Sequence, residues 1–261
     1  MLALVRRRQA GDKGTMQAFA RPIEDAGRWL VSLALPPRCP GCGTITAELH
    51  NFCAGCWRQI EWLGDAGCHS CGQPLEATDI ETCAACLAKP PVITRTRAAV
   101  AYGEATRTLP LRLKYSRKVA LAKTMARYMR PLLDVAGEPV LVPVPLHRSR
   151  LWARGFNQSA LLAAELGRGC GLDHDPFVLE RRKRTSALKG MSPLQRKREV
   201  AGAFGVARAE AVKGRKIILV DDVLTTGSTA NGCAKALRRA GASRVDLICW
   251  ARVVRPTQLM R

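Results

Sequence analysis

The sequence contains no run of about 18 apolar residues, the length that a membrane-spanning helix requires. The stretch 30–35 is mostly apolar, but it is too short and no Ala-x-Ala cleavage site follows it. We therefore expect no transmembrane helix, no secretory signal peptide and a cytoplasmic location. Gly-Lys-Ser/Thr is also missing, so the chain has no P-loop for a nucleoside triphosphate.

Net charge is missing from the first third of the chain. Residues 1–90 hold nine Lys or Arg and nine Asp or Glu, so residues 91–261 carry the whole formal net charge of +21. A strongly basic domain favours polyanionic ligands, among them phosphorylated sugars and nucleic acid. A generally basic proteome is the alternative explanation of this excess.

The most informative stretch is 216–229. Residues 216–220, which are apolar apart from Lys216, predict a buried strand, and residues 229–240 predict a helix. Between them stand Asp221, Asp222 and a Thr/Gly/Ser loop, at the strand end where open α/β sheets bind ligands. Such a loop binds phosphate at a helix N-terminus, whereas paired carboxylates suit ribose hydroxyls, directly or through Mg²⁺. The stretch therefore predicts a site for a phosphorylated sugar, with a buried strand and an ordinary polar loop as the alternative.

The whole pattern resembles the ribose-phosphate signature of the type I phosphoribosyltransferases, whose substrate is phosphoribosyl pyrophosphate (PRPP). The resemblance implies that Asp221 and Asp222 are the catalytic residues and hold the ribose hydroxyls of PRPP. It also implies that the 5′-phosphate binds to the loop residues Thr225, Thr226, Gly227, Ser228 and Thr229.

Eight of the eleven cysteines form four C-x-x-C pairs, which are Cys39/Cys42, Cys53/Cys56, Cys68/Cys71 and Cys83/Cys86. Without a secretory signal, this spacing indicates zinc rather than disulfides, and redox C-x-x-C motifs rarely occur four in tandem. Two such pairs complete one tetrahedral site, so we expect two Zn²⁺ ions, both structural because no ligand position stays open. The expected pairing is sequential, 39/42/53/56 and 68/71/83/86, with an interleaved cross-brace as the alternative. His50 and His69 are not expected to be ligands.

This double zinc ribbon is a poor candidate for DNA binding, because it lacks net positive charge and its thiolates add negative charge. We expect it instead to dock onto the basic domain. Phe52, Trp57 and Trp62 supply either that contact or a surface for a partner.

Apolar patterning predicts the remaining elements. We expect strands over 95–102, 139–144, 175–181, 203–206 and 243–254, and helices over 16–34, 105–114, 119–133 and up to about 169. Basic and amide side chains, among them Arg148, Arg154 and Gln158, follow the strand at 139–144, and such a cluster suits a pyrophosphate, which requires cations or Mg²⁺. His147 beside them is either an acid–base group or polar surface.

Four consecutive cations, 181–184, have three readings. They form a solvated loop, a mobile loop that closes over the pyrophosphate, or a track for single-stranded nucleic acid. Few aromatic residues lie near enough in the sequence to stack on bases.

Several motifs together resemble the ComF family, namely 35–43, Lys114-Tyr115, 142–147, 154–158, Arg184-Thr185, Gly202-Ala-Phe204 and 220–229. The resemblance implies an α/β fold: a type I phosphoribosyltransferase-like, mostly parallel sheet flanked by helices, with a small N-terminal double zinc ribbon. It adds Lys114, Val144, Arg148 and Arg154 to the PRPP-binding residues. It also implies a role in DNA uptake during natural transformation, or in the use of external DNA.

Two positions depart from the ComF pattern. Leu188 stands where Gln is expected, and residues 198–200 stand where Asn-Val is expected. Both departures concern the basic loop and the helix after it, which bear on contacts to the acceptor and on loop closure. The PRPP motif itself is intact.

We expect three parts: an N-terminal tail and amphipathic helix (1–35), the double zinc ribbon (36–90) and the phosphoribosyltransferase-like domain (91–261). Our interpretation is a phosphoribosyltransferase that binds PRPP with Mg²⁺ and transfers ribose 5-phosphate to an unidentified acceptor. The alternative is a non-catalytic protein that binds single-stranded DNA or a competence helicase or channel protein, with PRPP as a regulatory ligand or a vestige.

Overall fold

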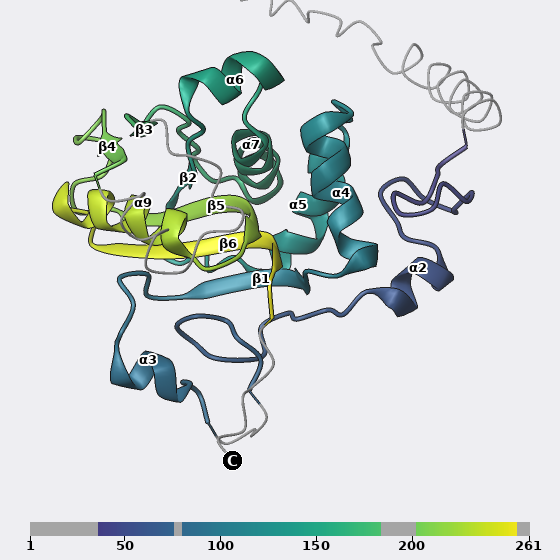
Figure 1. Cartoon of the computed structure of the whole chain (residues 1–261), viewed down its shortest axis with the longest axis horizontal. Coiled ribbons are helices and arrows are strands. Elements are labelled where there is room, and N and C mark those ends of the chain that lie inside the picture. The colour runs from purple at the N-terminus through teal and green to yellow at the C-terminus, as the bar shows by residue number, and fades with distance from the viewer. Residues whose placement is uncertain (1–35, 76–79, 184–201, 255–261) are drawn as a thin grey trace, which may run out of the picture.

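The computed structural model describes residues 36–75, 80–183 and 202–254 (Figure 1). The tail and helix expected within residues 1–35 lie outside the described residues, as do Arg184, Leu188 and positions 198–200. Within the described residues, a parallel sheet carries helices on both faces, and the cysteine-rich segment lies along one of its edges.

Four strands form the central sheet, in the order β1 (Thr96–Ala101), β6 (Arg244–Arg252), β5 (Lys216–Leu224) and β2 (Val140–Pro143). Every neighbouring pair is parallel. Residues 217–220 of β5 are fully buried, as expected of a strand that helices cover on both sides. The expected mostly parallel α/β sheet is therefore confirmed.

Helices cover both faces of this sheet. One face is covered by α4 (Glu104–Tyr115), α5 (Leu121–Met129) and α7 (Gln158–Cys170). The other face is covered by α9 (Ser228–Arg239) and by the antiparallel pair β3 (Leu179–Arg181) and β4 (Phe204–Val206). Alternate residues of β5 point to the two faces, so Ile218 packs with α5 and α7 whereas Leu219 packs with α9.

The structure changes several expected elements. The strand expected over 175–181 is confined to β3, because residues 175–178 are outside its pairing with β4. The strand expected to end at Val220 continues to Leu224, because β6 pairs with it along that whole length; Asp221 and Asp222 therefore lie within β5. The helix expected over 119–133 ends at Met129 and passes into the 3₁₀ turn η1 (Arg130–Leu132), where Pro131 has no N–H to donate. Residues 148–154 form the helix α6 (Arg148–Arg154), which the apolar pattern does not reveal because none of its residues is buried.

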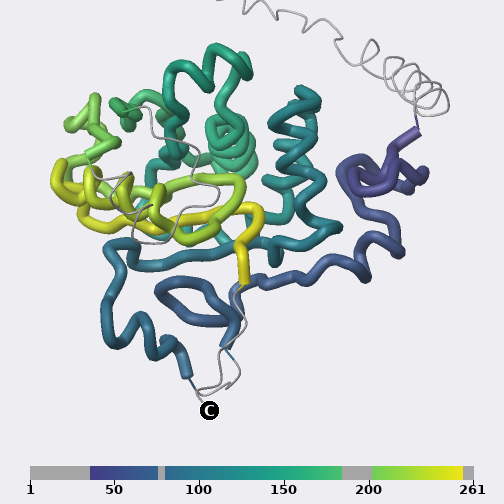
Figure 2. Tube along the Cα trace, in the orientation of Figure 1, coloured from purple at the N-terminus to yellow at the C-terminus, as the bar shows by residue number. Residues whose placement is uncertain are grey.

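The two halves of the zinc ribbon lie apart from each other, and both lie next to the β1 edge of the sheet (Figure 2). The first half, with α2 (Ala54–Gln59), packs on the face that α4 and α5 cover. The second half, with α3 (Ala84–Ala88), lies on the other side of β1. Between them, residues 61–63 run antiparallel to β1 and share its backbone hydrogen bonds: Ala101 N–H donates to Glu61 (2.9 Å) and Leu63 N–H donates to Ala99 (3.0 Å). This pairing covers an otherwise open sheet edge.

Aromatic side chains join the first half of the ribbon to the sheet. Phe52 stacks on the fully buried Trp250 at 6.4 Å between ring centroids, and Trp62 lies 5.0 Å from Tyr128. Trp57 contacts Trp62 at 4.5 Å. The expected docking onto the basic domain is confirmed, and Phe52, Trp57 and Trp62 make the contact.

Phe52→Ala tests this aromatic contact. Phe52 is only 9% exposed, so its truncation removes buried area and leaves a cavity; we expect the free energy of unfolding to fall by about 3 kcal/mol. Urea denaturation followed by tryptophan fluorescence measures this change. Leu49→Ala is the control, because Leu49 is 62% exposed in the same half of the ribbon. Equal effects of the two substitutions would contradict the assignment.

Candidate functional site

Two of the predicted motifs lie side by side at one end of the sheet. β2 and β5 are parallel neighbours, and the backbone N–H of Val144 donates to the carbonyl of Val220 at 3.0 Å. The chain after β2 therefore starts next to Asp221 and Asp222. Val144 is buried, and its own carbonyl accepts a hydrogen bond from the side chain of Asn157. Both the N–H and the carbonyl of Val144 are therefore used in hydrogen bonds that hold the fold together.

Asp222 is a buried carboxylate with two partners from two helices. Its side chain forms an ion pair with Lys114, which lies in the last turn of α4. Its Oδ1 accepts a hydrogen bond from the amide of Gln158, the first residue of α7, at 3.3 Å. Because Asp222 is 3% exposed, its charge depends on these partners rather than on water.

Asp221 is held differently. One of its oxygens accepts hydrogen bonds from the Ser159 hydroxyl and from the backbone N–H of Asp222, both at 2.9 Å. Burial of the carboxyl, to which the neighbouring charge of Asp222 adds, raises the pKa of Asp221 to about 7. Lys114 and the two hydrogen bonds act in the opposite direction. The two adjacent carboxyls therefore differ in their surroundings.

The loop after β5 presents backbone donors. Gly227 has a left-handed φ of 73° and is the N-cap of α9. The N–H of Asn231 donates back to the carbonyl of Gly227 at 2.8 Å, so the N–H groups of Ser228, Thr229 and Ala230 precede the first intrahelical bond. The first turn of α9 contains no acidic residue. This helix terminus is therefore suited to an anion.

Two hydroxyls border the same loop. Those of Thr226 and Ser228 are 3.0 Å apart and hydrogen-bonded to each other, while Thr225 is exposed. The loop thus combines side-chain hydroxyls with the backbone N–H groups of the helix terminus.

The side chain of Gln158 links Arg154 to the carboxylate of Asp222. The guanidinium of Arg154, at the end of α6, donates to Oε1 of Gln158 at 2.5 Å and lies 5.8 Å from the centroid of the Tyr115 ring. Arg154, Gln158, Asp222 and Lys114 therefore form one connected network. Arg148 is exposed at the start of α6 and is joined to this network by no contact among the described residues.

His147 is the N-cap of α6. Its Nδ1 accepts a hydrogen bond from the backbone N–H of Ser149 at 3.2 Å. The ring nitrogen therefore has a local structural partner, and an acid–base role for His147 stays a prediction.

Three residues around the carboxylates were not among the predicted PRPP-binding residues: Tyr115, Gln158 and Ser159. Of these, Gln158 was expected only to lie among the groups that suit a pyrophosphate. Gln158 and Ser159 follow Asn157, whose side chain accepts a hydrogen bond from the Ser159 N–H and so begins α7. An N-cap directly after a basic segment is the signal that could have found them, because it places the next two side chains at the end of the sheet.

The cysteines form two tetrads, Cys39/Cys42/Cys53/Cys56 and Cys68/Cys71/Cys83/Cys86, and the sulfurs within each lie within 4.8 Å of one another. The sequential pairing is therefore confirmed. Equivalent backbone N–H groups, of Cys53 and Cys83, donate to the first sulfur of each tetrad at 3.3 Å. Four sulfurs at this spacing fit a closed tetrahedral site, so the residues fit two structural Zn²⁺ ions.

The surroundings of the first tetrad favour the thiolate at Cys42 but not at Cys56, where burial raises the pKa of the thiol to about 12. A hydrogen bond with the Thr44 hydroxyl lowers the pKa of Cys42 to about 6. His50 instead contacts the hydroxyl of Thr124 at 2.8 Å and belongs to neither tetrad, as expected.

Mg²⁺ is the other metal that the sequence predicts. Asp222 is engaged by Lys114 and Gln158, and one oxygen of Asp221 is engaged by Ser159. Few oxygens remain for an octahedral ion, and the ammonium of Lys114 opposes one. The described residues therefore do not fit a Mg²⁺ ion held by the protein alone.

None of the helices in the described part of the chain has both the length and the apolar character needed to cross a bilayer.

Two families match the chain. Residues 30–87 match the double zinc ribbon domain, and residues 123–258 match the phosphoribosyl transferase domain.

Curated relatives match most of the chain. Competence protein F of Haemophilus influenzae is 30% identical over 219 residues, covering 80% of this chain and 94% of the relative. DNA utilization protein YhgH of Escherichia coli is 33% identical over 232 residues, covering 85% and 100%. Competence protein ComFC of Streptococcus pneumoniae is 28% identical, covering 74% and 84%.

Solved structures are more distant. Adenine phosphoribosyltransferase from Thermoanaerobacter pseudethanolicus is 14% identical, with a TM-score of 0.34, and covers 52% of this chain and 83% of that one. A similarity this low supports no inference about ligands.

The ion pair of Lys114 and Asp222 predicts non-additive stability effects. Lys114→Met leaves a buried carboxylate without its cation and should lower the free energy of unfolding by about 3 kcal/mol. Adding Asp222→Asn removes that charge and should restore most of the loss. Urea denaturation of the two single variants and the double variant measures the coupling; additive effects would contradict the pairing.

The raised pKa of Asp221 predicts a pH dependence. Between about pH 4 and pH 7 the folded protein keeps this carboxyl protonated whereas the unfolded chain ionises it, so the contribution of Asp221 to stability falls as pH rises through this window. Asp221→Asn cannot ionise. Its stability relative to the unsubstituted protein should therefore increase from pH 5 to pH 8, by an amount on the order of a few kcal/mol. Urea midpoints at both pH values test this; a constant difference would show that the pKa of Asp221 is ordinary.

Proposed function

The chain belongs to the ComF family, which joins a double zinc ribbon to a phosphoribosyltransferase-like domain, and from that premise we propose that it binds PRPP at the ends of β5 and β2. One observation carries the proposal. The N–H groups at the start of α9 have no intrahelical acceptor and follow two adjacent carboxylates of β5 through one short loop, so donors for a phosphate and acceptors for a ribose diol belong to the same strand–loop–helix unit.

Each part of PRPP has matching groups in this proposal. The 5′-phosphate binds to Thr225, Thr226, Gly227, Ser228 and Thr229. The ribose hydroxyls donate hydrogen bonds to Asp221 and Asp222. The pyrophosphate, which carries most of the charge, binds beyond β2, where Arg154 and Arg148 supply cations. PRPP brings Mg²⁺ with it, since its own oxygens bind the ion.

Lys114 and Gln158 act as positioning residues. Lys114 balances the charge of Asp222, and Gln158 links Asp222 to Arg154. The carboxylates are thereby held in place before the ligand arrives, which lowers the cost of ordering them on binding.

In the proposed reaction the bond between ribose C1 and the pyrophosphate oxygen breaks, and its electron pair leaves with pyrophosphate. A bond then forms between C1 and the acceptor, whose proton passes to water. Positive charge develops on the ribose between these events. Asp221 and Asp222 are suited to stabilise it, because they lie in a poorly solvated site.

The cellular role that we propose is in DNA uptake or utilisation, in the cytoplasm. Relatives at 28–33% identity are called competence proteins and DNA utilization proteins. Those names describe the relatives, and they support this role for the present chain.

Calorimetric titration of the zinc-replete protein with PRPP and Mg²⁺ tests the site. We expect binding by the unsubstituted protein and a loss of at least about tenfold in affinity in the Asp221→Asn/Asp222→Asn double variant, because it loses both carboxyl groups that would accept hydrogen bonds from the ribose hydroxyls. Asp173→Asn is the control, since that carboxyl is 81% exposed and lies in a different cavity. Absence of binding by the unsubstituted protein, or equal binding by the double variant, would refute the proposal.

A second candidate function is binding of single-stranded DNA. Trp152 on α6 is 88% exposed and Tyr115 is 75% exposed, and the guanidinium of Arg154 lies over the Tyr115 ring. Arg148 and Arg150 are exposed on the same helix. Exposed aromatic rings among cations form a stacking platform for bases beside phosphate contacts.

Trp152→Ala tests this platform. Loss of one stacked base should weaken binding of an oligothymidylate by about 1–3 kcal/mol, measured by fluorescence anisotropy. The matched control is Phe177→Ala, because Phe177 is 68% exposed and also has an arginine over its ring. Affinity should also fall steeply with salt concentration. Flat salt dependence, or equal effects of the two variants, would exclude the platform.

A further inference from the structure

The ammonium of Lys114 is paired with the one oxygen of Asp222 that has no other partner among the described residues. Oδ1 of Asp222 accepts a hydrogen bond from Gln158, whereas Oδ2 is buried and has Lys114 as its ion-pair partner. The side chain of Asp222 is 4% exposed and that of Lys114 is 21% exposed. Water therefore screens this pair weakly, and Lys114 neutralises a carboxylate that would otherwise attract another cation.

The packing of α4 fixes the position of Lys114. Leu109 and Leu113 on this helix are fully buried, so the backbone that carries Lys114 belongs to the packed body of the protein. Lys114 also lies in the last turn of α4, where the helix dipole favours a positive charge. The cation is therefore part of the site before any ligand arrives.

The neighbouring oxygens do not complete a ligand set for a divalent ion. Oε1 of Gln158 accepts a hydrogen bond from Arg154 at 2.5 Å, and Oδ1 of Asp221 accepts one from Ser159 at 2.9 Å. Within the described part of the chain, no hydrogen bond or ion pair engages the second oxygen of Asp221. Burial raises the pKa of Asp221, and the positive charge of Lys114 acts against that rise, so the ammonium influences both carboxyls. A divalent ion beside them would meet this charge.

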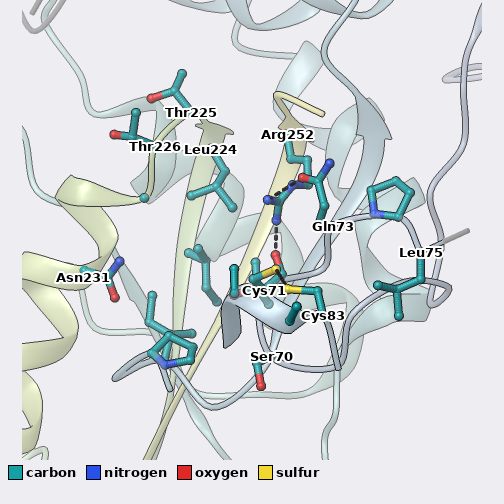
Figure 3. A pocket seen from close by; sticks show the side chains of 18 of the residues that line it. Ser70, Cys71, Gln73, Leu75, Cys83, Leu224, Thr225, Thr226, Asn231 and Arg252 are labelled. Atoms are coloured by element: carbon teal, nitrogen blue, oxygen red, sulfur yellow. Dashed lines mark hydrogen bonds between the residues drawn. The ribbon is translucent and has the colours of Figure 1, made fainter. Parts of the chain in front are cut away.

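The space on the ribbon side of the phosphate loop offers no other carboxylate. A cavity of about 620 Å³ lies there, between the second half of the zinc ribbon and the end of β5, and residues 225–227 border it (Figure 3). Among the described residues that line this cavity there is no Asp, Glu or Lys, and the guanidinium of Arg252 binds the ribbon. Of the described residues around the loop, Asp221 and Asp222 are therefore the ones that could hold a metal ion.

We infer that Lys114 is the built-in cation of this site, and that its ammonium takes the position in which the two carboxylates would otherwise hold a divalent metal ion. While Lys114 is present, Asp221 and Asp222 bind no Mg²⁺ of their own. For PRPP, a consequence that rests on the proposed function, the metal then enters only with the oxygens of the ligand. Lys114 thus determines which cation the carboxylates accept.

Titration with Mn²⁺, followed by electron paramagnetic resonance, tests the inference on the zinc-replete protein without any phosphate ligand. Mn²⁺ is the probe because it prefers the same oxygen ligands as Mg²⁺. Lys114→Ala vacates the space beside Oδ2 of Asp222 and removes the charge, so we expect it to bind Mn²⁺ at least about tenfold more tightly than the unsubstituted protein. Adding Asp222→Asn should abolish this gain. Lys114→Arg keeps a cation at the position and should show no gain.

Two further variants control for net charge and for folding. Lys118→Ala is the matched control, because Lys118 is exposed in the turn after α4 and forms no ion pair with Asp222; it removes the same charge and should leave Mn²⁺ binding unchanged. Lys114→Gln keeps a hydrogen-bond donor beside Asp222 but carries no charge, so it should fold and still gain Mn²⁺ binding. Circular dichroism establishes that each variant is folded.

The outcomes separate this inference from the proposed function. A gain of Mn²⁺ binding in Lys114→Ala that Asp222→Asn removes supports the cation role, and it does so even if calorimetry detects no PRPP binding, a result that overturns the proposed function alone. PRPP binding without a gain of Mn²⁺ binding in either folded variant, Lys114→Ala or Lys114→Gln, overturns the inference alone. Mn²⁺ binding by the unsubstituted protein that Asp222→Asn abolishes, or equal gains in Lys114→Ala and Lys118→Ala, also overturns it.

Discussion

Two carboxylates placed side by side near the end of one strand repel each other, and the groups packed around β5 offset that repulsion. Asp222 is buried. It forms an ion pair with Lys114 on α4 and accepts a hydrogen bond from the amide of Gln158 on α7. Asp221 accepts a hydrogen bond from the hydroxyl of Ser159 on α7, and its pKa is raised. Apolar residues at both positions would remove the electrostatic cost. The pair is therefore better explained by chemistry at the strand end than by stability.

The zinc ribbon is part of the same architecture. Neither half has a large apolar core, so each depends on its metal ligands and on the surface that it covers. The first half buries Phe52 against Trp250, and the second is tied to the sheet through Arg252. Since the connecting residues 61–63 pair with β1, the two halves are fixed on opposite sides of one strand. Zinc binding thus stabilises the walls of a cavity at the end of the sheet.

Contiguous sequence motifs made the zinc ligands and the strand–loop–helix unit of the candidate site predictable. The order of strand, Asp221, Asp222, loop and helix is contiguous in the sequence, and so is each C-x-x-C pair. Contacts between distant positions were harder to foresee. Gln158 and Ser159 meet β5 across 64 and 62 residues, and an amide or hydroxyl has no periodic pattern that would indicate its partner. Docking of the ribbon could be expected from its aromatic residues, but the placement of its two halves on opposite sides of β1 could not, because cysteine spacing specifies the metal ligands and not the surface that each half covers.

NMR with backbone amides as probes tests the central claim most directly, namely that the start of α9 is a phosphate site. The isotope-labelled, zinc-replete protein would be titrated with ribose 5-phosphate. The account predicts that the amide resonances of residues 226–230 shift in a saturable way, while those of α2 and the first tetrad stay in place. Shifts confined to other basic segments, such as α6, with residues 226–230 unchanged, would contradict it.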